Sequence, residues 1–178
     1  MARTRYKIYD PEAPHFLTAT VVEWRSLFKY PFAASIVLDS MRHLSEEDEW
    51  TIHAYVLMED HLHWIAQADQ LGKTVRSFKS YTARRVIDAL RRRHFSHELT
   101  HLKKAKSGHK QGQSYQLWQE GNQPKQLSSR EMIRQKIDYI HENPVKRGYV
   151  ERPWHWRYSS AGDYATGETG LVPIVADY

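Results

Sequence analysis

Residues 55–65 read YVLMEDHLHWI, an apolar and aromatic stretch that is interrupted once, by Glu59 and Asp60. The interruption divides a longer segment into two strand-like runs, 51–58 and 61–68. This pattern predicts a β-hairpin with a two-residue loop, although the glycine that such turns favour is absent. Because side chains alternate along a strand, His61 and His63 are expected on one face of it and the residues between and after them on the other.

A strand and two helices are expected around the hairpin. Residues 15–24, HFLTATVVEW, are β-branched and aromatic and predict a strand. Apolar residues recur at helical spacing in 32–44 and in 74–93, which predicts an amphipathic helix on each side of the hairpin. SYQLWQ, at 114–119, is typical of a short strand.

A last helix is expected before Pro144. Ser128 and Glu131 are spaced as in a capping box, and the proline favours an extended Asn143, which would end the helix. The order strand, helix, hairpin, helix, short strand, helix predicts an α+β fold of one domain, residues 1–178, with helices packed over one face of an antiparallel sheet. Ferredoxin-like and RRM-like folds share this arrangement, which by itself says little about function.

Positive charge is concentrated in one part of the chain. Residues 76–110 contain eleven Lys and Arg and two acids, a net charge of +9, whereas the remainder of the 178 residues is at −4. A cationic block predicts a polyanionic partner, although a solvated helix face has the same composition. Residues 96–114 are polar, basic and without periodicity, and we expect a mobile basic loop there.

Composition limits the other possibilities. The chain has no cysteine, which excludes disulfides and thiolate metal sites. No apolar run approaches the roughly 18 residues that indicate a membrane-spanning helix, and residues 1–17 lack the apolar segment of a signal peptide. A soluble intracellular protein without a membrane partner is expected.

The two histidines of the hairpin are candidate metal ligands. Two neutral imidazoles on one face of a strand can bind one divalent cation. A pair is not a complete site for Mg²⁺ or Mn²⁺, which prefer oxygen-rich coordination, so a third ligand and open positions for water or phosphate are required. Histidines that only pack against a sheet give the same pattern.

The last helix carries a polar line. Tyr139 and Asn143 are four residues apart and Lys136 precedes Tyr139 by three, so the three share a face, offset from the isoleucines of this helix. A phenol, an amide oxygen and an ammonium group can supply a nucleophile, a metal ligand and a phosphate contact. Packing by the tyrosine and capping by the asparagine is the alternative interpretation.

These motifs resemble those of the single-tyrosine HUH transposases (IS200-like), and most of all the REP-associated tyrosine transposases. The resemblance covers nearly the whole chain, from YVLMEDHLHWI through LWQEG (117–121) and YIHENPVKRGYV (139–150) to WRYSS (156–160). Each piece is weakly specific alone, whereas their order and spacing together are specific. Glu59-Asp60 stands where the family more often has Pro-Asn, and GNQPKQL (121–127) lacks the aromatic and histidine residues often seen after WQ.

The resemblance implies metal-dependent transesterification on single-stranded DNA. In it His61 and His63 match the metal ligands, Tyr139 the nucleophile that forms a 5′-phosphotyrosine, and Asn143 the position of a third ligand, while His141 is expected to face away. The implied cofactor is Mg²⁺ or Mn²⁺, and the implied substrate is a palindromic repeat (REP) hairpin with a flanking single-stranded tetranucleotide. The resemblance also implies a monomer or homodimer in the bacterial cytoplasm, associated with the nucleoid.

Basic and aromatic side chains are candidates for contacts with DNA phosphates and unpaired bases. They are Arg76, Lys79, Arg84, Arg85, Arg91, Arg92, Arg93, Lys103, Lys104, Lys136, Lys146, Arg147 and Trp118. Further candidate stacking platforms are Trp154, Trp156 and Tyr158.

Three other functions fit parts of the pattern. A nonenzymatic RRM-like binding module would not need the histidines and the tyrosine to converge, and the aromatic clusters of that module are missing. A metal-dependent phosphoesterase would activate water and form no covalent intermediate, with Glu59 and Asp60 as the only nearby acids. A catalytically inactive relative would bind DNA hairpins as a regulator.

Overall fold

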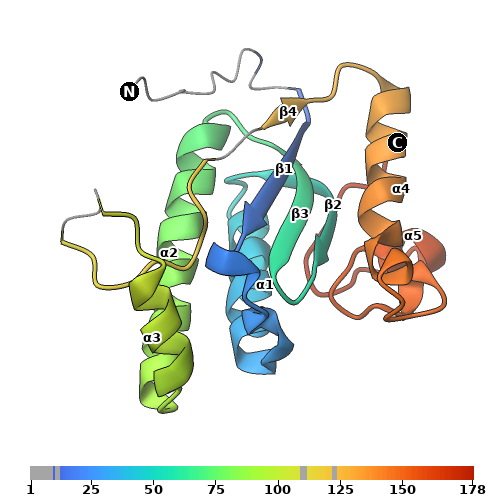
Figure 1. Ribbon diagram of the computed structural model, residues 1–178. Helices are drawn as coiled ribbons and strands as arrows, with labels where there is room; N and C mark the ends of the chain where they lie inside the picture. Colours follow the sequence, from blue (N-terminus) through green and yellow to red (C-terminus); the bar gives the residue numbers. More distant parts are fainter. Residues whose placement is uncertain (1–9, 11–12, 109–111, 122–123) are drawn as a thin grey trace.

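A four-stranded antiparallel sheet lies at the centre of the molecule (Figure 1). The computed structural model describes residues 10, 13–108, 112–121 and 124–178. The strands are β1 (His15–Thr20), β2 (Thr51–Leu57), β3 (His61–Gln67) and β4 (Lys125–Gln126). Their order in the sheet is β2-β3-β1-β4, with every pairing antiparallel. This arrangement confirms the predicted α+β, ferredoxin-like architecture.

Helices cover both faces of the sheet (Figure 1). The helices α1 (Pro31–Glu46) and α2 (Leu71–Arg92) pack on one face, and α4 (Arg130–Lys146) lies against the other. The expectation of helices over one face only is therefore wrong. The second face is apolar at Ala54, Val56 and Ile65, which need cover and receive it from the isoleucines of α4.

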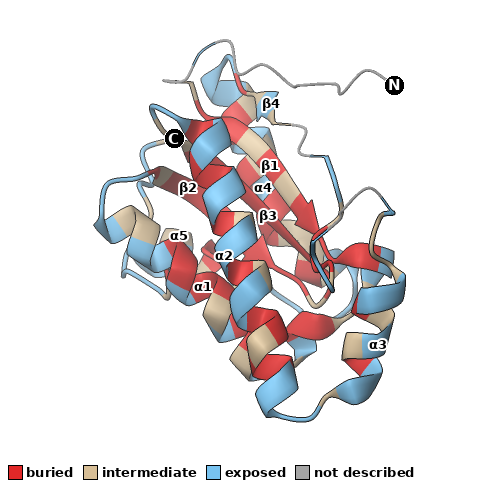
Figure 2. Cartoon of the chain, turned by 90° about the vertical axis from the view of Figure 1, so that its left-hand side faces the viewer, coloured by how far each residue is buried: buried red, intermediate tan, exposed pale blue. Residues whose placement is uncertain are grey.

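Burial follows the alternation of side chains along the strands. In Figure 2 the buried residues are concentrated on the strands and on the inward sides of α1 and α2. The predicted apolar face of the second helix is confirmed, because its members are all buried: Val75, Phe78, Thr82, Val86, Ala89 and Leu90. In the described part of the chain no helix is both long and apolar enough to cross a membrane.

The hairpin between β2 and β3 has the predicted two-residue loop. The backbone N–H of Met58 donates to the carbonyl of His61 at 2.8 Å, across Glu59 and Asp60. The C-terminal segment then closes the outer edge of β2. Leu57 N–H donates to the carbonyl of Tyr158 at 2.8 Å, and Val175 N–H donates to that of Ile52 at 2.8 Å. These bonds satisfy an edge that would otherwise be open to non-native pairing.

The basic segment contains a helix, α3 (Ser96–Lys104), where a mobile loop was expected. Leu102 is fully buried in the core, and Glu98 accepts hydrogen bonds from Arg25 at 2.9 and 2.5 Å. The expectation is therefore wrong for this part, because tertiary contacts hold a helix whose own periodicity is weak. Residues 109–111 of the expected loop lie outside the described residues.

The two outer strand predictions also need correction. The first strand ends at Thr20, because Val22–Trp24 form the 3₁₀ turn η1, followed by η2 (Leu27–Lys29). Residues 114–119 form no strand and make one isolated bridge, between Trp118 and Val21. The fourth strand is instead β4, which pairs with His15 and Phe16 of β1.

The last helix begins and ends later than predicted. Its N-cap is Ser129, whose Oγ accepts from the N–H of Met132 at 3.2 Å, and not Ser128. The helix continues through Pro144 to Lys146, and the prediction that it stops at Asn143 is wrong. Pro144 is buried and its carbonyl accepts from the N–H of Tyr149 at 3.0 Å, so packing outweighs the usual effect of proline. The turn η3 (Pro153–His155) and the short helix α5 (Ala161–Thr166) follow.

Candidate active site

His61 and His63 lie on the face of β3 that α4 covers. Their ring centroids are 4.6 Å apart with an interplanar angle of 69°, and both residues are buried. Leu62 and Trp64 pack into the core on the opposite face. The predicted common face of the two imidazoles is confirmed.

Asp60 orients the ring of His61. Its Oδ1 lies 2.5 Å from Nδ1 of His61, and its Oδ2 lies 3.5 Å from Nη1 of Arg147. The same Arg147 nitrogen lies 3.2 Å from Oε1 of Glu59. A carboxylate that accepts from Nδ1–H fixes the tautomer whose Nε2 has a free lone pair. The contact with Asp60 therefore leaves the lone pair of His61 Nε2 available.

Thr18 has the equivalent position beside His63. It lies opposite His63 in the β1–β3 pairing, with its Oγ1 2.8 Å from Nδ1 of His63. Phe16, two residues earlier on the same strand, stacks on the imidazole with ring centroids 5.3 Å apart. When Nδ1–H donates to the hydroxyl, Nε2 of His63 is also left free.

Burial disfavours the charged form of both imidazoles. Burial, together with nearby His61, Lys136 and Arg147, lowers the pKa of His63 to about 3. Burial also lowers the pKa of His61, against the opposing effect of its hydrogen bond to Asp60. Neutral imidazole is the form that binds metal ions.

Tyr139 extends from α4 next to this pair. Its ring centroid lies 5.5 Å from that of His63 and 5.9 Å from that of Phe16. The residue is 39% exposed, so a substrate can reach it. The ammonium groups of Lys136 and Lys146 lie 4.9 and 5.6 Å from the centre of the tyrosine ring. A phenol between a histidine and two cations is suited to meet a phosphate group.

The two other candidate ligands on α4 point in different directions. Asn143 Nδ2 donates to the carbonyl of Tyr139 at 2.6 Å, so the predicted common face of these residues is confirmed. His141 is buried, its Nε2 lies 2.9 Å from Ser160 Oγ, and its ring packs against Tyr164. It faces away from the His pair, as predicted. The role of Asn143 as a ligand stays a prediction.

The donor set fits a divalent cation with open coordination positions. Over the described ranges, no group of three or more His, Asp or Glu side chains is arranged to hold a metal ion. The pair His61 and His63 would therefore need oxygen ligands from Asn143, water or phosphate. Because Asp60 and Thr18 contact Nδ1 of the two imidazoles, both Nε2 atoms are left for such a cation.

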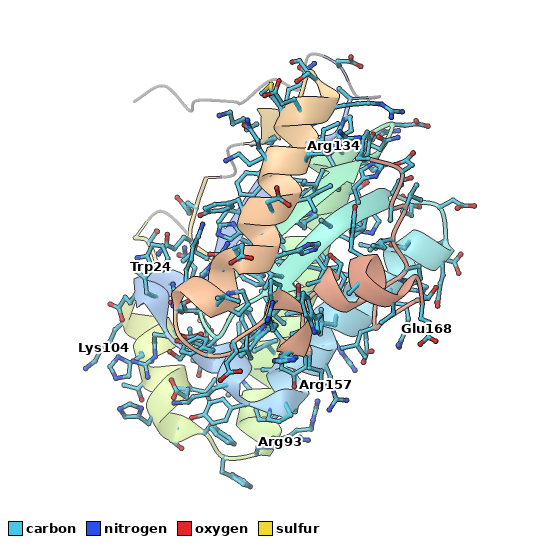
Figure 3. All side chains as sticks on the ribbon, turned by 90° about the vertical axis from the view of Figure 1, so that its right-hand side faces the viewer. Trp24, Arg93, Lys104, Arg134, Arg157 and Glu168 are labelled. Carbon is cyan, nitrogen blue, oxygen red and sulfur yellow. The ribbon has the colours of Figure 1, made fainter. Side chains whose placement is uncertain are left out.

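The candidate DNA-binding residues lie on both sides of the sheet. Lys136, Lys146 and Arg147 belong to the α4 side, next to Tyr139 and Asp60. The candidates on α2 and α3 belong to the other layer, and Figure 3 shows Arg93 and Lys104 below α4 in that view. Among the candidates on α2 and α3, Lys79 is half-buried and donates to the carbonyl of Gln119. The others are exposed, namely Arg76, Arg84, Arg85, Arg91, Arg92, Arg93, Lys103 and Lys104. DNA that contacts both groups must pass around the sheet.

Trp118 is a core residue, which corrects its assignment as a stacking platform. It is 4% exposed, its Nε1–H donates to Thr82 Oγ1 at 3.0 Å, and its ring packs on Phe28. Trp154 is 49% exposed, and Trp156 stacks on Tyr149 with ring centroids 5.5 Å apart. These two remain candidates for contacts with bases.

Sequence reasoning did not identify Phe16, Thr18 or the orienting role of Asp60. Alternation along the first strand places Phe16 and Thr18 on one face. Their meeting with His63 depends on the register of β1 against β3, which the sequence does not specify. The one sequence feature that could have indicated the role of Asp60 is that Glu59-Asp60 stands where the family more often has Pro-Asn.

Comparisons with known proteins identify the family of the chain. The sequence pattern of the family "Transposase IS200 like" matches residues 15–143. No curated protein is significantly similar in sequence. Among solved structures, a REP-associated tyrosine transposase bound to a REP hairpin superposes with a TM-score of 0.67 at 20% identity, over 100% of this chain and 95% of that one. A candidate transposase from Deinococcus radiodurans R1 gives a TM-score of 0.45 at 21% identity, over 79% of this chain and 98% of that one. The family match extends over well more than half of the chain, which therefore belongs to the IS200-like transposases, enzymes that process DNA.

Proposed function

We propose that the chain is a metal-dependent single-stranded DNA endonuclease and strand transferase that acts next to DNA hairpins through Tyr139. The observation that carries this proposal is the 5.5 Å separation between the ring centroids of Tyr139 and His63. The nucleophile comes from α4 and the His pair from β3, on segments far apart in the sequence. A nonenzymatic binding module has no need of this convergence.

Tyr139 would supply the attacking oxygen. Its Oη forms a bond to the phosphorus of a phosphodiester, and the bond from that phosphorus to the 3′ oxygen breaks. The phenol loses its proton, and the 3′ oxygen leaves with the electron pair and is protonated to a free 3′-OH. The 5′-phosphate stays esterified to Tyr139. Attack by a 3′-OH on this ester restores a phosphodiester, so one hard displacement becomes two easier ones.

The remaining residues would position the phosphate. His61 and His63, with Asn143, would hold Mg²⁺ or Mn²⁺, which when bound supplies a Lewis acid to the phosphate. Lys136 and Lys146, which flank the ring of Tyr139, would contact phosphate oxygens. Asp60, Arg147 and Thr18 would hold the imidazoles in their metal-binding tautomers through the contacts described above.

Hairpin DNA is the proposed substrate class. The structural relative with a TM-score of 0.67 is bound to a REP hairpin. In this chain the exposed cations of α2 and α3 supply a surface for the phosphates of a duplex stem. The site on the α4 side would then receive the single-stranded flank.

One chain would be sufficient for catalysis. Tyr139 lies beside His63 of its own chain, so the site needs no tyrosine helix from a second copy. This supports action as a monomer over exchange of α4 within a homodimer.

A strand-cleavage assay tests the proposal. The native chain and Tyr139→Phe are incubated with a hairpin carrying a single-stranded flank, drawn from palindromic repeats of the source genome, and with Mg²⁺ or Mn²⁺. A metal-dependent covalent protein–DNA band that Tyr139→Phe lacks supports the transposase chemistry. Cleavage without that band, unaffected by Tyr139→Phe, indicates a water-activating phosphoesterase. Binding without cleavage indicates an inactive DNA-binding relative.

A further inference from the structure

Trp24 is an exposed aromatic side chain next to the His pair. The residue is 58% exposed, and its ring centroid lies 6.2 Å from that of His61. It extends from η1, at the left of the view in Figure 3. A single exposed tryptophan is ordinary on a protein surface. Two features of Trp24 are less common: it lies beside a candidate metal ligand, and its backbone has an unusual conformation.

The backbone at Trp24 is in a costly conformation. Glu23 and Trp24 have φ angles of 55° and 53°, two successive non-glycine residues in the left-handed region. Such residues cost free energy and persist only where surrounding contacts fix them, most often at ligand-binding sites.

Those contacts tie the turn to the loop that precedes His61. Val21 N–H donates to the carbonyl of Asp60 at 2.9 Å, and Phe28 N–H donates to that of Glu59 at 2.9 Å. Between these two anchors, Arg25 pairs with the buried Glu98 of α3 at 2.5 Å. The backbone that carries the indole is therefore held beside the loop that precedes His61.

We propose that Trp24 is the stacking platform for an unpaired base next to the scissile phosphate. The inference rests on the function proposed above, since that function places single-stranded DNA at the His pair. Every base has a π face, so an indole binds unpaired nucleotides with little selection among them. Because the backbone of this turn is already held, binding a single strand here requires less ordering of the protein.

The test pairs protein variants with DNA variants. In the Tyr139→Phe chain, which cannot cut, Kd is measured by fluorescence anisotropy with Mn²⁺ for a hairpin with its single-stranded flank. Each flank nucleotide is then replaced in turn by an abasic one. The same DNA series is titrated with Trp24→Ala, Trp24→Phe and Tyr81→Ala added to this background. Tyr81 is the matched control, because it is 52% exposed and lies on α2 on the other face of the sheet.

Trp24→Ala is expected to weaken binding of the intact flank by about 5- to 150-fold, equivalent to about 1–3 kcal/mol at 1.4 kcal/mol per tenfold. This loss should disappear with the DNA that lacks the stacked base, since neither partner then has a contact to lose. Trp24→Phe should keep most of the affinity. Tyr81→Ala should change the Kd for every DNA by the same factor. Thermal unfolding of each variant verifies that the exposed substitutions leave the fold intact.

An unchanged Kd for Trp24→Ala, or an equal loss with every abasic DNA, overturns the assignment of Trp24. If the native chain still forms the covalent complex in that case, the proposed function stands and only this inference fails. If the native chain neither cuts the hairpin nor binds its flank, the proposed function and the assignment of Trp24 are both wrong.

Discussion

The Oδ1 atom of Asp60 lies 2.5 Å from Nδ1 of His61, so the residue directly before the first histidine fixes the orientation of its ring. Partners that orient a ligand typically contribute about 10- to 100-fold to metal affinity. We expect Asp60→Ala to weaken Mn²⁺ binding to the Tyr139→Phe chain by about that factor, measured by isothermal titration calorimetry. Asp39→Ala is the control, because Asp39 pairs with Arg42 on the exposed side of α1. Equal affinities for the two variants would contradict the role of Asp60.

The ion pair between Arg25 and Glu98 should stabilise the attachment of α3. The side chain of Glu98 is 8% exposed and that of Arg25 is 20% exposed. Removing one partner of a buried pair leaves an unpaired charge, and the partial exposure of Arg25 reduces the cost of that charge. We therefore expect Glu98→Gln to lower the free energy of unfolding by about 2 kcal/mol, measured by urea denaturation. Asp39→Asn, in an exposed pair, should change stability by less than about 0.5 kcal/mol. A similarly small change for Glu98→Gln would rule out the anchoring role.

The buried His141 should make stability depend on pH. Burial lowers its pKa to about 4. Between about pH 4 and pH 6.5 the unfolded chain, in which a histidine titrates near 6.5, binds more protons at this residue than the folded chain does. The contribution of His141 to stability is therefore complete above about pH 6.5 and falls as the pH drops toward 4. From about pH 7.5 to about pH 5 the contribution lost is about 2 kcal/mol. His141→Gln should reduce the loss of stability over this interval by about that amount, measured by urea denaturation at both pH values. An unchanged pH dependence would show that His141 is not the responsible group.

The cations of α2 should contribute to DNA affinity without affecting the chemistry. Arg84 and Arg85 are exposed on the helix that lies on the other face of the sheet from Tyr139. Replacing both with alanine should weaken hairpin binding and reduce the slope of log K against log salt by about 1.4–1.8 if each contacts one phosphate. The rate of cleavage in the saturated complex should stay the same. Arg42→Ala on α1 is the control. If the variant without Arg84 and Arg85 has the same salt slope as the native chain, these phosphate contacts are excluded.

Local patterns in the sequence were sufficient for the hairpin, the helix faces and the common face of the two histidines. They were insufficient where tertiary contacts override local preference. The helix α3 exists because Leu102 and Glu98 find partners in the rest of the molecule. The continuation of α4 through Pro144 has the same kind of cause, since the buried proline is held by packing.

The site was predictable to a similar extent. Spacing along β3 and α4 indicated which side chains share a face, and the resemblance indicated that the two faces meet. The partners of the histidines depend on the register of β1 against β3 and on the hairpin loop, which periodicity does not determine. Trp118 was misassigned because an aromatic residue in a polar segment has the same local sequence whether it packs inward or is exposed.

Mapping the attachment site of a covalent protein–DNA adduct shows directly whether Tyr139 is the nucleophile. The native chain is incubated with hairpin DNA and Mn²⁺, the adduct is digested with trypsin and nuclease, and the modified peptide is identified by mass spectrometry. We expect one nucleotide, joined through its 5′-phosphate, on the peptide that contains Tyr139, among the 11 tyrosines of the chain. An adduct on a different tyrosine, or cut DNA with no adduct on any of them, would show that Tyr139 is not the nucleophile.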